Sequence, residues 1–384
     1  EAISYQLSAV SHGLAAHYDA LRKIRTRKAL LRSDLWKTIG AEVERVCSAV
    51  EVRAHAAARP LGERVRVAAW NIQRGRRFDQ LLRALREEPT LAAADVLLLC
   101  EVDCGMARSA NRHVARELAA ALGMSYAFGV SYLVLEDDWG ESVDGVANER
   151  ALAGAAVLSR APIEAVENVD VPELRDKFSS SEKRLGKKRA LVCRLAGARP
   201  LTVAACHLDS NASPQGRARQ LEAIVAAGER LAGDGALLVG GDLNTTTYDL
   251  AGPASLARNL LHKLVVTGFD ETVRQYMTPE RRYERPVFEM LRAHGLAVDG
   301  FNDRQSGTLH FDINDEYALQ KTRRLVGAPL TRLLVRKLEP WNGRVPARLD
   351  WFAGRAVTPV AASTIDPRPA ASDHAAIVVD LRLR

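Results

Sequence analysis

The chain has 384 residues, and its content of 47% hydrophobic and 26% charged residues is ordinary for a soluble globular protein with a sizeable core. The formal net charge of +7 suits an anionic partner such as a phosphate ester, nucleic acid or acidic lipid headgroup, although an Arg-rich and Ala-rich composition explains it equally well. No apolar run reaches the roughly 18 residues of a membrane-spanning helix, so no transmembrane helix is expected.

The five cysteines form no CxxC pair and show no zinc-finger spacing. Free thiols without a disulfide framework are typical of a reducing compartment, and a cytoplasmic location is therefore expected. Secretion stays open as the alternative, because the chain begins at Glu1 and an export signal could have been removed. Nothing in the sequence indicates the oligomeric state.

Residues 1–60 are predicted to form a helical extension ahead of the main domain. Leu31, Leu35 and Ile39 recur at helical spacing, and Ser33 is a suitable cap between two helical segments. None of the candidate site residues falls in this stretch. It could pack against the main domain or bind a partner, and the sequence does not separate the two.

From residue 64 to 384 short apolar strands alternate with helices, which predicts one layered α/β domain. Several strands are apolar on both faces and should therefore be central and covered on both sides. A long insertion around 246–347 is expected to carry substrate specificity or to lie at an edge. Strands are predicted at 65–70, 95–100, 151–159, 189–196, 201–207, 236–240, 348–353 and 375–383, and helices at 79–87, 109–122, 214–232 and 280–294.

Residues 172–189 are predicted to form an exposed basic loop, because cations gather among serines without a strong strand pattern. They include Lys177, Lys183, Arg184, Lys187, Lys188 and Arg189. Such a loop would suit a polyanionic substrate, since phosphate contacts dominate the affinity of nucleic-acid-binding proteins. Inositol phosphates and lipid headgroups would use the same cations, and the loop could also be merely solvated.

Polar residues that can hold a metal or a phosphate stand at or beside the ends of five predicted strands, and a further pair precedes the last strand. They are Asn71, Glu101, His207, Asp242, Asn244 and Asp350, followed by the pair Asp373-His374. A carboxylate at the end of a buried strand is costly unless it is paired or bound to metal, and Mg²⁺ prefers oxygen ligands. Glu101 and Asp373, with Asn71 as a neighbour, are therefore the candidate metal site, although a salt bridge to an arginine would also satisfy Glu101.

Asp242 and Asn244 are two residues apart, so in a strand their side chains point to the same face. A carboxylate beside an amide can orient a water molecule and donate a hydrogen bond to a phosphate oxygen, and an Asx-capped turn is the alternative. Asp350 is the candidate group that orients His374, which could then donate to a phosphate oxygen. His207 follows an apolar run, where a lone histidine is more often structural, but it repeats the strand-end pattern.

Six motifs follow one another in order: WNIQRG at 70–75, LLLCEVD at 97–103, CHLDS at 206–210, GGDLNT at 240–245, RLDWF at 348–352 and SDHAAIVV at 372–379. In this order they resemble the endonuclease/exonuclease/phosphatase superfamily, and AGAAVLSRAPI at 153–163 resembles its central strand. The resemblance covers about residues 64–384. It implies a four-layer αββα sandwich of two mixed β-sheets, with the helical extension lying outside it.

The resemblance also implies a phosphoesterase that uses Mg²⁺, or Mn²⁺, bound chiefly by Glu101 with Asp373 and Asn71 nearby. It implies that Asp242 orients or deprotonates the attacking water and that Asn244 supports the transition state. The groups expected to contact the substrate phosphate are His374 braced by Asp350, His207, Arg74 and Arg150.

Two departures from the family pattern narrow these expectations. Repair nucleases of the exonuclease III type carry a Tyr-x-Pro-Asn segment where this chain has Cys206-His207-Leu208-Asp209, which disfavours abasic-site repair and favours the His-Leu branches. Gln73 replaces the second acidic residue that some members carry, so a second metal site is not expected.

The substrate stays open between nucleic acid and a phospholipid or inositol phosphate. The alternative of another class is a non-catalytic binding module on the same fold, but all eight strand-end positions hold chemically competent residues. A zinc-dependent amide hydrolase is disfavoured, because the set lacks the His and Cys ligands that zinc prefers.

Overall fold

The computed structural model describes residues 9–136, 143–180, 182–245, 268–312 and 344–383, with position 258 and isolated positions between 319 and 339. The insertion expected around 246–347 is thus described in part, and the rest of it lies outside the described residues. No helix in the described ranges is both long and apolar enough to span a membrane.

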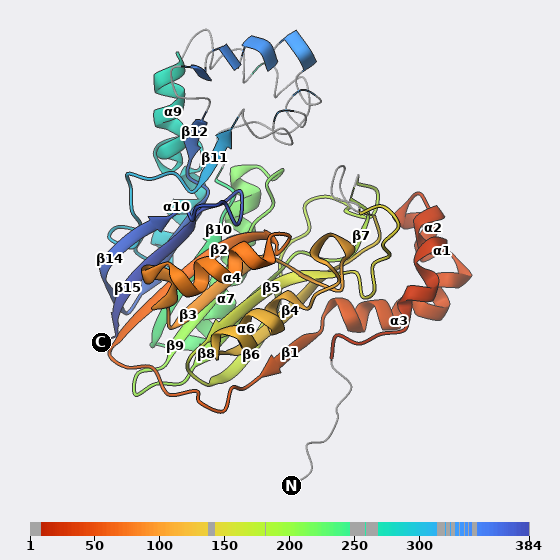
Figure 1. Ribbon diagram of the computed structural model, residues 1–384, viewed down its shortest axis with the longest axis horizontal. Helices are drawn as coiled ribbons and strands as arrows, with labels where there is room; N and C mark the ends of the chain where they lie inside the picture. Colours follow the sequence, from red (N-terminus) through yellow and green to blue (C-terminus); the bar gives the residue numbers. More distant parts are fainter. Residues whose placement is uncertain are drawn as a thin grey trace.

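Two mixed β-sheets form the centre of the molecule (Figure 1). The first has the strand order β1-β4-β5-β3-β2-β15-β14, with β7 paired to β4, and the second has the order β13-β10-β9-β8-β6. The strands of the first sheet are β1 (Val50–Arg53), β2 (Arg64–Arg74), β3 (Val96–Cys104), β4 (Ser125–Val134), β5 (Leu152–Ser159), β7 (Arg184–Gly186), β14 (Val357–Ile365) and β15 (Ala376–Leu383). Those of the second are β6 (Ile163–Asp170), β8 (Arg189–Leu195), β9 (Leu201–His207), β10 (Ala236–Asp242) and β13 (Asp350–Arg355). A separate antiparallel pair, β11 (Leu309–Asp312) and β12 (Arg344–Ala347), belongs to the insertion.

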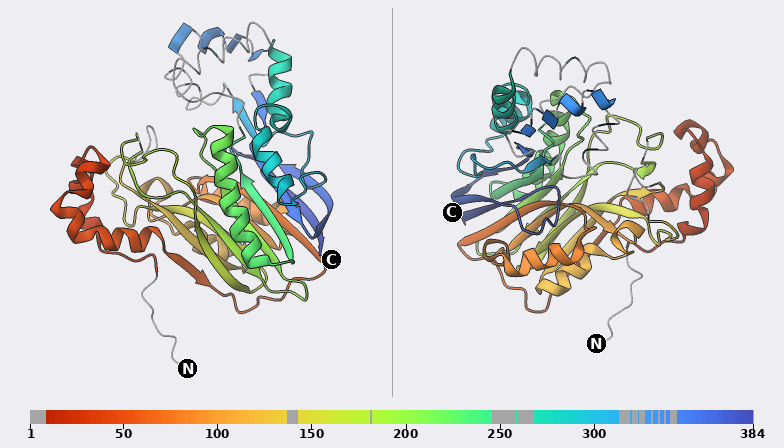
Figure 2. Two further views of the ribbon diagram at one scale, coloured as in Figure 1. Left: turned by 180° about the vertical axis from the view of Figure 1, so that it is seen from behind. Right: turned by 45° about the horizontal axis from the view of Figure 1, so that its top comes forward.

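Helices cover the outer face of each sheet. Figure 1 shows α4 and α6 in front of the first sheet, and the view from behind in Figure 2 shows α7 along the second. Ser213 caps α7 by accepting from the Gly216 amide, and Pro214 occupies its first turn, where a missing amide proton costs nothing. The helices are α1 (Tyr18–Lys23), α2 (Arg27–Leu31), α3 (Asp34–Cys47), α4 (Phe78–Glu87), α5 (Pro89–Ala92), α6 (Val114–Leu122), α7 (Pro214–Ala232), α9 (Phe269–Met277) and α10 (Arg285–Ala293), with 3₁₀ turns η1 (Leu14–His17), η2 (Ala107–Ser109) and η4 (Pro279–Arg281).

Three apolar clusters lie between the layers, and β3 shows how one strand serves two of them. Leu97 and Leu99 belong to the cluster shared with α3, α4 and α6, whereas Leu98 belongs to the cluster between the sheets. Alternate side chains of a strand point to opposite faces, so both faces of β3 are buried and its apolar run is explained. The third cluster joins the second sheet to α7 and α10, where the Phe288 ring meets Trp351 edge-on at 4.8 Å. The predicted four-layer αββα sandwich is confirmed.

The N-terminal extension is helical only as far as α3. Ser33 caps α3 as predicted, accepting a hydrogen bond of 3.1 Å from the Trp36 amide. The helical prediction is wrong at β1, which pairs antiparallel with β4 at the edge of the first sheet. Its side chains alternate, with Glu51 buried and Val52 exposed, and Glu51 accepts from Arg116 and Tyr126. The strand therefore ties the extension to the main domain.

Candidate active site

The strand-end residues meet because of the direction in which each strand runs. β2 and β3 are parallel in the first sheet, and β9 and β10 are parallel in the second, so the carboxyl ends of each pair share an edge. Asn71 and Glu101 lie at that end of the first pair, and His207 and Asp242 end the second. The Asn71 amide donates to both Glu101 and Asp242, so the two sheets present these residues at a common edge.

Two further strands begin at this edge because they run the opposite way. β13 is antiparallel to β10 and pairs Asp350 with Asp242. β15 is antiparallel to β2, and His374 stands two residues before its start. Strands that run up to the edge and strands that start from it thus bring residues from 71 to 374 together.

Glu101 and Asn71 form the half of the site that belongs to the first sheet. Both strand pairings of β3 shift register around Glu101, whose φ of 51° is unusual for a side-chain-bearing residue, and such local strain is typical of functional positions. Glu101 Oε1 accepts from Asn71 Nδ2 at 3.2 Å, and its side chain is 26% exposed. Burial would raise the pKa of Glu101, but the Arg74 guanidinium, with Nε 3.5 Å from Oε2, and His207 hold it well below its usual value. Glu101 is therefore ionised and accessible.

Asp242 is the hub of the half that belongs to the second sheet, and it is buried. Its Oδ2 accepts from Asn71 Nδ2 and Asn244 Nδ2, both at 3.1 Å, and its Oδ1 accepts from the Asn244 amide at 2.8 Å. Asn244 also donates to the Leu208 carbonyl and has a φ of 48°. Burial raises the pKa of Asp242 against the opposing charge of His374, which moves it toward the range of a general base. The predicted pairing of Asp242 with Asn244 is present.

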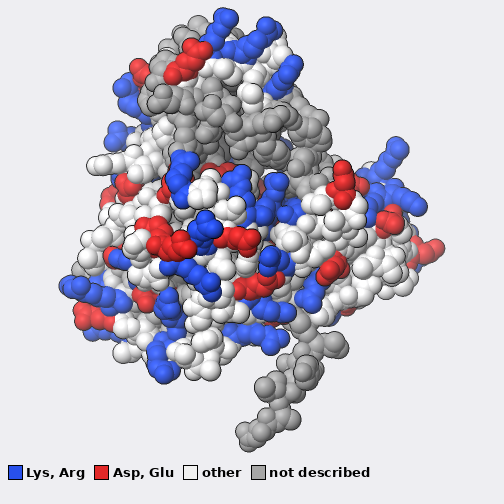
Figure 3. Space-filling model, viewed as in Figure 1, with Lys and Arg blue, Asp and Glu red and all other residues white. Residues whose placement is uncertain are grey.

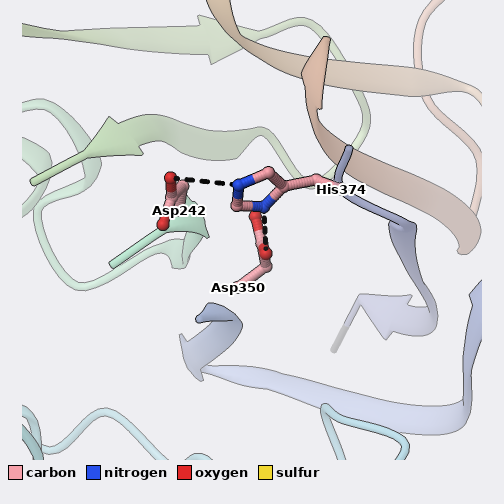
Figure 4. Close-up of side chains that lie close together, drawn as sticks. All are labelled: Asp242, Asp350 and His374. Carbon is pink, nitrogen blue, oxygen red and sulfur yellow. Dashed lines mark hydrogen bonds and ion pairs between the residues drawn. The ribbon is translucent and has the colours of Figure 1, made fainter. Parts of the chain in front are cut away.

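His374 lies between Asp350 and Asp242, as Figure 4 shows. Its Nδ1 is 2.8 Å from Asp350 Oδ2, and its Nε2 is 3.9 Å from Asp242 Oδ2. Burial would lower the pKa of His374, but the two carboxylates raise it well above its usual value. The carboxylates thus favour the imidazolium form of the ring, which Asp350 fixes with Nε2 facing Asp242.

His207 completes the set, with Nε2 3.6 Å from Asp242 Oδ2 and 3.8 Å from Glu101 Oε1. Burial and then the charge of Lys188 lower the pKa of His207 to about 4, in spite of the two carboxylates. His207 is therefore neutral where His374 is charged, and the two rings offer different hydrogen-bonding roles at one site.

Three predicted residues stand apart from these contacts. Asp373 is exposed, and its carboxylate accepts only from Ser372 Oγ among the described residues. Arg74 reaches Glu101 but also donates to Glu182 at 2.6 Å. The Arg150 guanidinium lies 3.9 Å from the Cys104 sulfur, three residues beyond Glu101 along β3. The roles of Asp373 in metal binding and of Arg74 and Arg150 in phosphate binding stay predictions.

The prediction of an exposed basic loop at 172–189 is wrong for most of its cations. Lys183 is 9% exposed and donates to the carbonyls of Arg22 and Ile24 in the N-terminal extension. Lys177 donates to Asp209 at 2.9 Å, and Arg184 pairs with the buried Glu182. Arg22, Ile24 and Asp209 lie outside the segment in the sequence, which explains why local composition suggested a solvated loop.

Thr308, in the insertion, is a site residue that sequence reasoning missed. It is fully buried, and its Oγ1 accepts from the amides of Leu349 and Asp350 at 2.9 and 3.1 Å. Its carbonyl accepts from the Ala375 amide at 2.7 Å, so Thr308 contacts the backbone on both sides of the His374–Asp350 pair. No chemical signal marks an isolated threonine, and only the pairing across the fold reveals it.

The donors present suit a hard divalent cation. Glu101 offers an ionised, partly exposed carboxylate, and Asp373 an exposed one. Asn71 Oδ1 accepts from the Gln73 amide at 3.1 Å while its Nδ2 faces the carboxylates, so Asn71 here orients Glu101. Asp242, Asp350 and His374 each offer one donor atom, and these atoms lie within 4.8 Å of one another. This is the one cluster of three or more His, Cys, Asp or Glu side chains with such spacing in the described part of the chain. In that group His374 is hydrogen-bonded to Asp350, and Asp242 is hydrogen-bonded to Asn71 and Asn244, which favours proton transfer and orientation as its task.

The model of the Endonuclease/Exonuclease/phosphatase family matches residues 68–374. The chain belongs to this family. Membership supports phosphoester hydrolysis as the class of reaction and divalent metal as the family's usual requirement, and the matched range holds every strand-end residue named above. A comparison with curated protein sequences returned no match.

Solved structures of the endonuclease/exonuclease/phosphatase fold resemble the chain at low identity. One from Beutenbergia cavernae has 18% identity and a TM-score of 0.49, covering 84% of this chain and 72% of its own. The human Nocturnin catalytic domain with bound sulfate has 16% identity and a TM-score of 0.46, covering 87% and 96%. A 3'-5' exonuclease from Neisseria meningitidis has 16% identity and a TM-score of 0.44, covering 82% and 98%.

Proposed function

We propose that the protein is a Mg²⁺-dependent phosphoesterase that hydrolyses a P–O bond by in-line attack of water. The observation that carries the proposal is the meeting of an accessible ionised carboxylate, Glu101, with a buried base, Asp242, and an imidazolium, His374, at one edge. In-line displacement at phosphorus needs positioning and charge neutralisation more than covalent chemistry, and this set supplies both.

Glu101 and Asp373 would hold the cation, with Asn71 keeping Glu101 in place. When bound, the cation would polarise the phosphoryl group and offset its negative charge. Mn²⁺ would suit the same oxygen donors.

Asp242 would orient the attacking water and accept its proton. Its two oxygens are held by Asn71 and Asn244, so the carboxylate is fixed before substrate arrives. Asn244 donates to Leu208 and Asp242 and would support the transition state by holding Asp242, and neutral His207 would hydrogen-bond a phosphate oxygen. His374, held by Asp350, would donate from Nε2 to charge developing on phosphate oxygen.

The substrate class is inferred from the charges around the site rather than from the site residues themselves. Lys, Arg, Asp and Glu are interspersed over the face seen in Figure 3, which is the pattern of a mixed surface. With most of the 172–189 cations committed to internal partners, a compact phosphoester that enters the strand-end site is favoured over a long polyanion that lies across that segment. A nuclease acting on a flexible single strand is the second candidate.

The test is an activity screen with Mg²⁺ across plasmid DNA, RNA, sphingomyelin, inositol phosphates and a generic phosphodiester, with the Asp242→Asn protein as control. We expect hydrolysis of at least one substrate that is lost with EDTA and in the variant. A folded wild-type protein inactive on all five, or equally active without metal, would contradict the proposal.

A further inference from the structure

Lys188 lies at the active-site edge although it is not a strand-end residue of the family motifs. β8 runs antiparallel to β9 with Leu191 opposite Ala205, so β8 starts at the edge where β9 ends at His207. Lys188 directly precedes β8. Its charge lowers the pKa of His207, and the Asp242 carboxylate in turn acts to raise the pKa of Lys188, which agrees with this placement.

The Lys188 side chain is largely buried, and its ammonium makes no hydrogen bond among the described residues. Its side chain is 9% exposed, and its one ion pair among the described residues is with Asp209 Oδ1 at 3.9 Å. Hydrogen bonds from an ammonium to a carboxylate are shorter, at about 2.7–2.9 Å. The three donors of Lys188 are therefore unused by the described part of the protein.

Asp209 is already engaged by other groups, which explains the long distance. Its Oδ1 accepts from Lys177 Nζ at 2.9 Å and its Oδ2 from Gln220 Nε2 at 2.9 Å. The Asp209 amide donates to Gln220 Oε1 at 3.0 Å, so the residue is held on three sides. Lys188 is thus the cation beside Asp209 that has no short bond to it.

A largely buried lysine without a short partner costs free energy, because its charge has lost part of its hydration and gained little in return. Lys187, its neighbour, shows the ordinary alternative: it is 49% exposed and lies 3.5 Å from Asp170. The fold therefore keeps one of two adjacent lysines solvated and holds the other, with only a long ion pair, at the edge where β9 ends at His207.

We propose that Lys188 is a substrate-binding residue whose ammonium, beside His207, takes a non-bridging oxygen of the substrate phosphate. The inference rests on the proposed phosphoesterase function and adds a phosphate contact to it. A point charge in a buried setting neutralises the phosphoryl oxygens more strongly than it would in water, and the site's carboxylates make such a counter-charge necessary.

The experiment measures the binding of inorganic phosphate by calorimetry in the presence of Mg²⁺, which requires no turnover. Lys188→Met keeps the length of the side chain and removes the charge, Lys188→Arg keeps the charge, and Lys187→Met is the matched control. A charge-assisted hydrogen bond predicts that Lys188→Met weakens phosphate binding by about 10- to 100-fold. Lys188→Arg should retain most of the affinity, and Lys187→Met should bind as wild type.

Thermal unfolding of the same variants separates binding from structure. Removing an unpaired buried charge should leave the midpoint of Lys188→Met unchanged or raise it, whereas loss of a structural ion pair would lower it. Wild-type phosphate affinity in Lys188→Met, no phosphate binding by the wild type, or failure of both Lys188→Met and Lys188→Gln to fold would each overturn the proposal. Phosphate binding that depends on Lys188 in a protein inactive in the substrate screen would instead refute only the phosphoesterase function.

Discussion

The strand-end cluster and the segment 172–189 satisfy their charges in different ways. In the cluster the polar groups bond to one another, as Asn71 does to Glu101 and Asp242. In the segment the cations bond to groups elsewhere in the protein, as Lys183 does to backbone carbonyls of the N-terminal extension. One region is thus organised for a ligand, and the other, apart from Lys188, for holding the fold together. Charge content alone does not distinguish the two.

The largest effect on activity is expected from replacing Asp242, the hub of the strand-end cluster. Asp242→Asn keeps the shape of the side chain but removes the base, so kcat/KM on the substrate found in the screen should fall by about 10³-fold. Steady-state kinetics and thermal unfolding measure the two consequences, and the midpoint should stay near wild type. Asp170→Asn, at an exposed carboxylate, is the control. A variant that keeps wild-type activity would remove Asp242 from the mechanism.

The proposed role of Glu101 as a metal ligand is tested through the Mg²⁺ requirement of the activity. Glu101→Gln should raise the Mg²⁺ concentration for half-maximal activity by about 100-fold, because even groups outside the direct ligand set commonly contribute 10- to 100-fold. Activity is titrated with Mg²⁺ for the variant, the wild type and the exposed control Glu164→Gln. Superimposable titration curves for variant and wild type would show that Glu101 is not a ligand.

The segment is tested through stability. Lys183→Met leaves two carbonyls without their donor, so the free energy of unfolding should fall by about 2 kcal/mol while kcat/KM is unchanged. Chemical denaturation measures the first and kinetics the second, with Lys187→Met as the exposed control. The distinction between the two regions would fail if Lys183→Met lost activity without losing stability.

The pH dependence of stability isolates His207. Its pKa is lowered to about 4, so between that value and the ordinary value of about 6.5 the unfolded state binds more protons than the folded state. Stability therefore falls as the pH is lowered through this window, by about 2 kcal/mol between about pH 7 and pH 5. The raised pKa of His374 acts in the opposite direction, because the folded state already holds that proton at pH 7 while the unfolded state binds it only as the pH falls. His374 is present in both proteins compared below, so its contribution cancels between them. Denaturant titrations of wild type and His207→Asn at the two pH values should differ by this amount, and equal pH dependence would speak against a buried neutral His207.

The sequence could predict the fold and the strand-end cluster because both depend on local patterns. Apolar runs such as 95–100 mark covered strands, and the parallel pairs then bring their carboxyl ends to one edge. Seven strands were missed, namely β1, β4, β6, β7, β11, β12 and β14. β4 is buried along its whole length but mixes Ser, Tyr and Gly with apolar residues, and β14 is an edge strand with an exposed Val360, so neither shows a simple period.

The contacts that could not be predicted join residues far apart in the chain. The bond from Lys183 to Arg22, the crowding of Asp209 by Lys177 and Gln220, and the bonds from Thr308 to the amides before β13 each depend on tertiary packing. Composition showed that cations were present but not which of them had partners. Lys188 could be separated from its neighbours only once those partners were known.

The bonds of Thr308 limit how far the insertion could be shortened. Its hydroxyl and carbonyl bond to the chain on either side of the His374–Asp350 pair, and β11 and β12 carry it there. A minimal version of the enzyme would therefore have to keep this short strand pair even if the rest of the insertion were replaced by a linker. The same bonds make the strand pair part of the framework that holds the candidate active site.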